Sequence, residues 1–218
     1  MPPLTWAYIG DCVYELYIRT KLVNETKLKP HALHIEAIKH VKAKAQAETL
    51  KRIYDDLTEK EQEIVRREKL EEIRKVCNPY PEKYVKTHSL EDAKLLEDGT
   101  TDVRIAGRII FARKMGKLSF VRIRDLKGDM QLEFKIDVVG EERYDFFKKL
   151  IDTGDFIGAE GEIFTTQTGE KTLRVHSFEF LGKALRPLPE KFHGLVDTEL
   201  KYRQRYVDLI TNEESRKV

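Results

Sequence analysis

The sequence has little of what secreted and membrane proteins usually carry. Its 2 cysteines, Cys12 and Cys77, lie far apart and in no metal-binding spacing, so neither a disulfide framework nor a zinc site is predicted. It has no apolar run near the roughly 18 residues that a membrane-spanning helix needs. Its first residues show neither the basic nor the apolar region of a signal peptide. From these absences we expect no membrane partner and a reduced, cytoplasmic setting.

The sequence also has no large excess of basic over acidic residues, or of acidic over basic ones. Among 218 residues, 40 Lys and Arg stand against 38 Asp and Glu, which gives a net charge of +2. Residues 1–67 hold 12 basic and 10 acidic side chains, and the rest of the chain is balanced. A polybasic tail that binds nucleic acid by charge alone is therefore excluded. Any RNA binding has to come from a local patch and from base stacking.

Apolar residues recur with a helical period in the first part of the chain. Pro30 marks the start of a second helix, whose period continues to Ile53. Thr58 and Glu61 form a capping box that opens a third helix. Two prolines then end helical structure, and residues 78–99 are predicted to be a linker. The apolar stripe of the first helix consists of Trp6, Ile9, Val13, Leu16 and Tyr17.

From Asp102 onward the period changes to two, which is typical of strands with one buried face. Five strands are expected at residues 103–111, 119–125, 130–136, 156–165 and 171–180, with a short amphipathic helix at 141–151. Three strands, a helix and two strands is the order of an OB-fold barrel. The sequence therefore predicts an α+β protein: a helical N-terminal segment followed by a five-stranded OB-fold β-barrel. Another small β-barrel is the alternative.

Alternation along the strands predicts which side chains face solvent. In the first strand Phe111 is expected in the core. In the second strand Val121 and Ile123 take the core positions, so Phe120 points outward between arginines. An outward ring on a basic surface is what a base-stacking platform requires. In the third strand Gln131 is expected outside, where its amide offers a donor and an acceptor to a base edge.

Two further residues are candidates for RNA contacts, and each candidate has a structural alternative. Arg108 and Arg113 are predicted to hold phosphates or to stack on bases. For Phe120 the alternative is an aromatic side chain at the rim that covers the barrel end. For Gln131 the alternative is a solvated strand residue. Glu133 is also expected on the outer side of its strand.

Several motifs from residue 68 onward resemble class II lysyl-tRNA synthetases. The helical sequence REKLEEIR at residues 67–74 resembles the family's leading helix, and the first two predicted strands resemble its barrel. The remaining motifs are GDFIGAEG at residues 154–161, TQTGE at 166–170, LRPLPEKFHG at 185–194 and YRQRYVDLI at 202–210. The resemblance implies a helix and linker at 68–100, an anticodon-binding domain at 101–185, and a connection at 186–218 into a catalytic domain.

The synthetase resemblance also implies functions for single residues. It implies that Phe120, Gln131 and Glu170 bind the uridine-rich anticodon of lysine tRNA. The chemistry suits uracil, because a carboxylate accepts from its N3–H, an amide pairs with a carbonyl and a ring stacks on the base. The catalytic motifs of the family are missing from the sequence, so we expect no aminoacylation. The usual dimer of the family forms through that missing domain, which leaves a homodimer open.

Residues 1–67 resemble a different family, Mini-ribonuclease III. The likeness rests on LTWAYIGDCVYE at residues 4–15 and HVKAKAQA at residues 40–47. It implies that Asp11 binds Mg²⁺ for phosphodiester hydrolysis, with Glu15 as a weaker candidate on the same side of one helix. The alternative is a solvated helix face, since Arg19 follows Glu15 by four residues. The family's second half is missing, so no intact catalytic site is expected.

Together these observations predict a truncated nuclease segment fused to an anticodon-binding module. The expected partner is lysine tRNA, with structured ribosomal RNA as a second candidate. No cofactor is expected for the chain alone, although the parent families use Mg²⁺ and ATP. One alternative is a Mg²⁺-dependent endonuclease for double-stranded RNA, acting in ribosomal RNA maturation with its missing half supplied by another chain. Another is a partial gene product. The histidines at 31, 34 and 40 are predicted to be surface residues rather than metal ligands.

Overall fold

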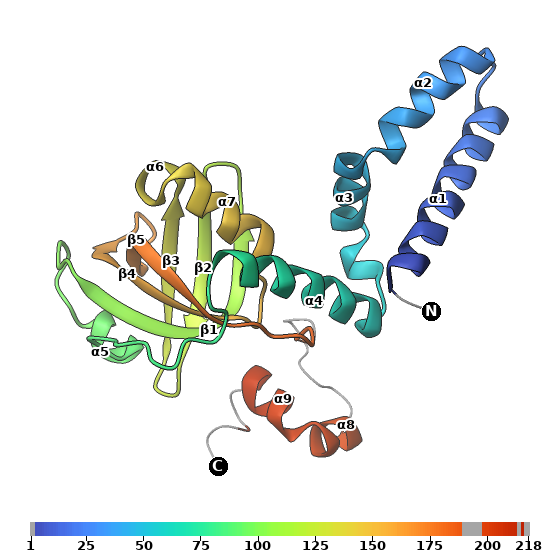
Figure 1. The fold of residues 1–218 in the computed structure, drawn as a ribbon. Coiled ribbons are helices and arrows are strands. Elements are labelled where there is room, and N and C mark those ends of the chain that lie inside the picture. The colour runs from blue at the N-terminus through green and yellow to red at the C-terminus, as the bar shows by residue number, and fades with distance from the viewer. Residues whose placement is uncertain (1–2, 189–197, 213–214, 216–218) are drawn as a thin grey trace. The chain divides into compact units, whose positions relative to one another are not determined.

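Figure 1 shows the fold in a computed structural model, which describes residues 3–188, 198–212 and 215. The chain divides into two compact units, Met1–Thr58 and Glu59–Val218. Helices make up the first unit, and a closed five-stranded barrel is the centre of the second. The predicted fold class is thereby confirmed. Of the motif at residues 185–194, the part from residue 189 onward lies outside the described residues.

The first unit consists of helices α1 (Pro3–Glu25), α2 (Pro30–Val41) and α3 (Ala43–Arg52) and the 3-10 turn η1 (Tyr54–Asp56). Helices α1 and α2 lie side by side as an antiparallel hairpin (Figure 1). Helix α2 begins at Pro30 as predicted, because the first position of a helix needs no N–H donor. The predicted continuous helix to Ile53 is wrong. Lys42 has extended backbone angles, φ −61° and ψ 142°, and separates α2 from α3.

The first unit buries little apolar surface. Among its described residues, Ala37 is the one hydrophobic side chain that is buried. The apolar stripe of α1 is exposed, with Val13, Leu16 and Tyr17 at 61%, 66% and 61%. No described element of this unit covers that side of α1, so the stripe contributes little hydrophobic stabilisation. None of the described helices combines the length and apolarity that crossing a lipid bilayer takes.

The second unit begins with α4 (Glu59–Val76) and includes the short helices α5 (Leu90–Lys94), α8 (Thr198–Arg203) and α9 (Arg205–Thr211). Helix α4 continues without a break past Arg67 and buries Leu70 and Ile73. Helix α5 lies where a linker was predicted, so that prediction is wrong for this segment. A capping box stabilises the start of α5: the Ser89 hydroxyl accepts from the Asp92 N–H, and the Asp92 carboxylate accepts from the Ser89 N–H.

Five strands form a closed barrel in the order β1-β2-β3-β5-β4. They are β1 (Val103–Lys114), β2 (Leu118–Arg124), β3 (Asp129–Lys135), β4 (Phe156–Thr165) and β5 (Lys171–Gly182). Neighbouring strands are antiparallel except at the closing pair, where β3 and β5 run parallel over three register positions, 131–133 against 172–174. Helices α6 (Ile136–Val139) and α7 (Glu141–Leu150) join β3 to β4. This is the predicted OB order.

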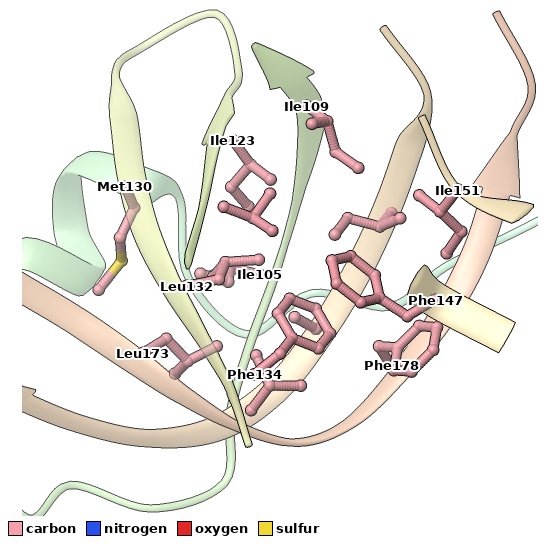
Figure 2. Close-up of a cluster of buried hydrophobic side chains, with 14 of the residues drawn as sticks. Ile105, Ile109, Ile123, Met130, Leu132, Phe134, Phe147, Ile151, Leu173 and Phe178 are labelled. Atoms are coloured by element: carbon pink, nitrogen blue, oxygen red, sulfur yellow. The ribbon is translucent and has the colours of Figure 1, made fainter. Parts of the chain in front are cut away.

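Helix α7 closes one end of the barrel with aromatic side chains. Figure 2 shows Phe147 of α7 against Phe134 and Phe178 inside the barrel. The Phe147 and Phe134 rings stack with centroids 4.2 Å apart, and Phe178 meets Phe134 edge-on at 5.5 Å. Ser119 and Tyr144, both buried, share a hydrogen bond of 2.7 Å between their hydroxyls. The core therefore fixes β2, β3 and β5 against one helix.

A buried ionic network joins α4 to the barrel. The Lys183 ammonium group donates to Asp152 at 2.7 Å and to Asp155 at 2.8 Å, and Lys183 and Asp155 have fully buried side chains. Arg66 of α4 donates to the carbonyls of Thr153 and Ala184. Burial by itself raises the pKa of Asp152, but the surrounding lysines outweigh it and lower that pKa to about 2. The network therefore depends on an ionised Asp152.

Candidate nucleic-acid interface

A β-bulge in β1 decides which side chains this strand turns outward. In the register with β2, Ile109 pairs with Ile123 and Phe111 pairs with Arg122, so Ile110 is an extra residue. The extra residue reverses the alternation for the rest of the strand. Phe111 therefore lies outside with 41% of its surface exposed, and the prediction that it faces the core is wrong. The same reversal turns Arg113 outward.

Strand β2 has regular alternation and presents Phe120 on the same side. Val121 and Ile123 are buried, whereas Phe120 and Arg122 are half-buried on the outer surface. Phe120 lies opposite Arg113 of β1 and opposite Glu133 of β3. We call the surface around it the β1–β3 face. It is made of Phe111, Arg113, Phe120, Arg122, Gln131 and Glu170.

Arg122 connects the β1–β3 face to the turn before β5. Its guanidinium donates to Glu170 at 2.9 Å and to Asp129 at 3.5 Å. Gln131 lies opposite Arg122, and its side-chain amide donates to the Thr172 hydroxyl at 3.0 Å. The amide oxygen of Gln131 accepts no hydrogen bond from the described residues, so it remains open to a ligand donor. The structure thus brings Phe120, Gln131 and Glu170 to one surface.

The charged side chains of the β1–β3 face differ in how accessible they are to a ligand. Arg113 is exposed and makes no ion pair or hydrogen bond with any described residue. Glu133, by contrast, is 5% exposed because Arg174 and Lys135 cover it at 3.0 and 3.3 Å. Glu133 thus lies on the outer side of β3, as predicted, but it is covered and not open to solvent. Within the described residues of this surface, Arg113 is the cation that is ready to bind a phosphate.

Arg108 does not join the β1–β3 face. It lies opposite Arg124, four register positions from Phe120, which is roughly 13 Å along the strands. Its guanidinium is stacked 4.2 Å from the centroid of Phe156 and donates to the Gly154 carbonyl at 3.2 Å. Burial lowers the pKa of Arg108. With Phe156 and Leu209 it lines a separate hollow of about 740 Å³. Its contacts anchor the loop before β4.

The carboxylates predicted for a metal site lie on α1. The Glu15 carboxylate accepts from Arg19 at 2.9 and 2.5 Å, and Asp11 is exposed one turn earlier. Over the part of the chain that the structure describes, no three His, Cys, Asp or Glu residues converge on a point. Mg²⁺ prefers several oxygen ligands in octahedral geometry. The donor set around Asp11 does not fit such a site. The histidines at 31, 34 and 40 are exposed, as expected.

Sequence reasoning missed Phe111 as an outer residue, although a signal for it was present. A strict period of two from Val103 places Arg113 inside the barrel together with Phe111. A charged side chain in an apolar core is costly, so the arginine itself indicates that the alternation breaks before it. The break leaves Lys114 on the inner side, where its ammonium group binds carbonyls at the end of α7 and burial lowers its pKa to about 8.

Comparison with known protein families matches both parts of the chain. Residues 103–181 match the family model described as the OB-fold nucleic acid binding domain. Residues 4–99 match the model of the Ribonuclease III domain. Both predicted resemblances are confirmed. The second match extends past residue 67, where the nuclease-like segment was predicted to end, and so overlaps the part that resembles synthetases.

Curated relatives match the second unit. The chain is 45% identical to the lysine–tRNA ligase of Lactococcus lactis subsp. lactis over 161 residues, which cover 69% of this chain and 32% of the relative. It is 50% identical to the lysine–tRNA ligase of Carboxydothermus hydrogenoformans over 157 residues, 70% of this chain and 32% of the relative. The chain therefore spans about a third of the length of these relatives. Its OB-fold domain is similar to that of lysine–tRNA ligases.

Proposed function

We propose that the second unit binds single-stranded RNA through the β1–β3 face, and that its ligand is the anticodon loop of lysine tRNA. The observation that carries the proposal is the orientation of Phe120. Its ring lies on the outer surface beside an exposed arginine, where an unpaired base has room to stack. The likeness of this domain to lysine–tRNA ligases supports lysine tRNA as the ligand.

The polar groups beside the ring suit a uridine. One N–H of the Gln131 amide donates to Thr172 and the other donates to a uracil carbonyl, and the carboxylate of Glu170 accepts the N3–H. Glu170 is held by Arg122 at 2.9 Å, which fixes the direction of its carboxylate. Arg113 contacts the backbone phosphate. Cytosine has a lone pair instead of an N–H at N3, so at that position Glu170 faces an acceptor, and the site binds cytosine more weakly.

A filter-binding titration with the anticodon stem-loop of lysine tRNA tests this proposal. Phe120→Leu removes a ring whose stacking is worth about 1–3 kcal/mol, so we expect about 5- to 150-fold weaker binding. Tyr80→Leu is the matched control, because Tyr80 is a 48% exposed ring that lies next to Gly182 instead of the β1–β3 face. Equal binding by the wild type and Phe120→Leu contradicts the proposal, and so does binding by neither.

A ribonuclease is the second candidate, because residues 4–99 match the Ribonuclease III domain. The ion pair of Glu15 with Arg19 argues against a metal centre on α1. We therefore expect no difference between the wild type and Asp11→Asn when structured ribosomal RNA is incubated with Mg²⁺ and resolved on a denaturing gel. Cleavage that requires both Mg²⁺ and Asp11 establishes the nuclease instead.

A further inference from the structure

The β1–β3 face carries two phenylalanines and two arginines in an alternating arrangement. Phe111 of β1 lies opposite Arg122 of β2, and at the next outward position Arg113 of β1 lies opposite Phe120 of β2. Each ring therefore has an arginine beside it on its own strand and another across from it. We propose that this arrangement binds two successive nucleotides: Phe111 stacks on a second base, next to the base on Phe120, and Arg113 binds the phosphate between them.

The spacing of the two rings suits neighbouring nucleotides whose bases are splayed apart. The residues are diagonal neighbours across an antiparallel pair, which places them about 7–8 Å from each other. Two bases stacked on each other are about 3.4 Å apart, so a stacked pair does not reach both rings. An extended single strand, with each base on its own ring, matches the distance. This is how aromatic side chains on barrel surfaces bind successive bases.

The bulge at Ile110 indicates that Phe111 belongs to the surface and not to the core. If β1 paired with β2 without the bulge, Ile110 would take the outward position opposite Arg122. Phe111 would then lie on the inner side of β1, where a phenylalanine gains free energy from burial. With the bulge, the small Ala112 takes that inner position and Phe111 keeps 41% exposure. Bulges commonly redirect a side chain at a binding site. The same residue also turns Arg113 outward, so one extra residue creates half of the alternating arrangement.

The position of the phosphate follows from the ion pairs of the two arginines. Arg122 is already bound to Glu170 and Asp129, which neutralise its charge. Arg113 makes no such pair with the described residues and is exposed. It is adjacent to both rings, two positions from Phe111 on β1 and opposite Phe120. A phosphate that joins two bases on these rings therefore lies within reach of Arg113.

This inference rests on the proposed RNA binding, and abasic substitution tests the two separately. The wild type, Phe111→Leu and Phe120→Leu are titrated with the anticodon stem-loop and with versions lacking one base at each loop position. In the wild type, we expect loss of either of two adjacent bases to weaken binding about 5- to 150-fold. For Phe120→Leu, we expect that losing one of these two bases does not weaken binding any further. For Phe111→Leu, we expect the same result for the neighbouring base.

Each outcome distinguishes the two proposals. If Phe120→Leu weakens binding while Phe111→Leu and Tyr80→Leu bind like the wild type, the second platform is refuted and the RNA-binding proposal stands. If neither Phe111→Leu nor Phe120→Leu weakens RNA binding, both proposals are refuted. Arg113→Gln gives an independent measure, because removing one phosphate-binding cation lowers the slope of log affinity against log salt concentration by about 0.7 for a single strand. An unchanged slope contradicts the assignment of the phosphate to Arg113. Circular dichroism of each variant verifies that the barrel is folded.

Discussion

At the scale of single residues, Arg122 organises the charges of the β1–β3 face. It binds Glu170 and Asp129 from two different turns. These side chains are partly exposed, so the pairs add little to the stability of the fold. Their effect is on orientation, since Glu170 is held near Gln131 with its carboxylate direction fixed. In the proposed RNA complex, selectivity for a base therefore depends on an interaction that stability measurements alone do not reveal.

Replacing Glu170 tests that selectivity. The Glu170→Gln side chain both donates and accepts, so it pairs with cytosine N3 as readily as with uracil N3–H. We expect the preference for a uridine-containing anticodon loop over one with cytidine to fall about tenfold, within the range that one base-specific hydrogen-bonding pair contributes. The measurement is competition between the two stem-loops. Glu162→Gln is the control, because Glu162 is similarly exposed and pairs with Arg174 at 3.9 Å. A preference that survives in Glu170→Gln contradicts its role.

The sequence predicted the residues of β2 better than those of its neighbours. Strand β2 alternates without interruption, so Phe120 was placed outward from two buried neighbours. Phe111 was misplaced because a bulge changes parity without a glycine or proline to mark it. The burial of Glu133 on the outer side was missed because the arginine that covers it, Arg174, comes from a strand 41 positions later. The local periodicity of a strand does not predict contacts with segments that are distant in the sequence.

At the scale of elements, the attachment of α4 to the barrel depends on the charge of Asp152. Its folded-state pKa of about 2 lies below the ordinary value of 3.8, so folding favours the ionised form. The stabilisation is complete above about pH 4 and is lost as the pH falls through 2, with a magnitude of about 2 kcal/mol. Asp155 acts in the opposite direction, because burial raises its pKa despite Lys183.

Urea unfolding of Asp152→Asn and the wild type at pH 7 and at pH 2 measures this contribution. We expect the variant to be less stable by about 2 kcal/mol at pH 7, and the difference to shrink as the pH is lowered. Asp145→Asn serves as the control, because the Asp145 carboxylate pairs with Lys149 on an exposed helix surface. A difference between Asp152→Asn and the wild type that is independent of pH shows that the ionised carboxylate is not the cause.

The boundaries of helices and strands were predicted correctly where turn residues or proline mark them in the sequence. The strands follow from a period of two and clear turns, α7 follows from its amphipathic pattern, and Pro30 fixes the start of α2. The break at Lys42 was not predicted, because residues 40–47 contain neither glycine nor proline. Helix α5 was missed because it has only five residues, too few for a helical period to be seen. Its capping box, Ser89 with Asp92, was the available signal.

At the scale of the whole molecule, the two units differ in how much apolar surface they bury. The barrel unit contains nearly all the buried hydrophobic side chains among the described residues, and the first unit contributes Ala37. Segments with few buried contacts open more readily than a packed core. We therefore expect limited trypsin digestion of the full chain to cleave first within residues 1–58. The product, identified by mass spectrometry, begins near residue 59 and resists further digestion. Initial cleavage inside the barrel contradicts this order.

Closure of the barrel depends on the shortest of its strand pairings, the parallel ladder of β3 and β5 over three register positions. Gln131 lies on one side of that ladder, and Glu170 immediately precedes the other. A nucleotide that binds both side chains bridges the two strands. Ligand occupancy and barrel closure are then thermodynamically linked, and the amide protons of residues 131–133 exchange with solvent more slowly when RNA is bound.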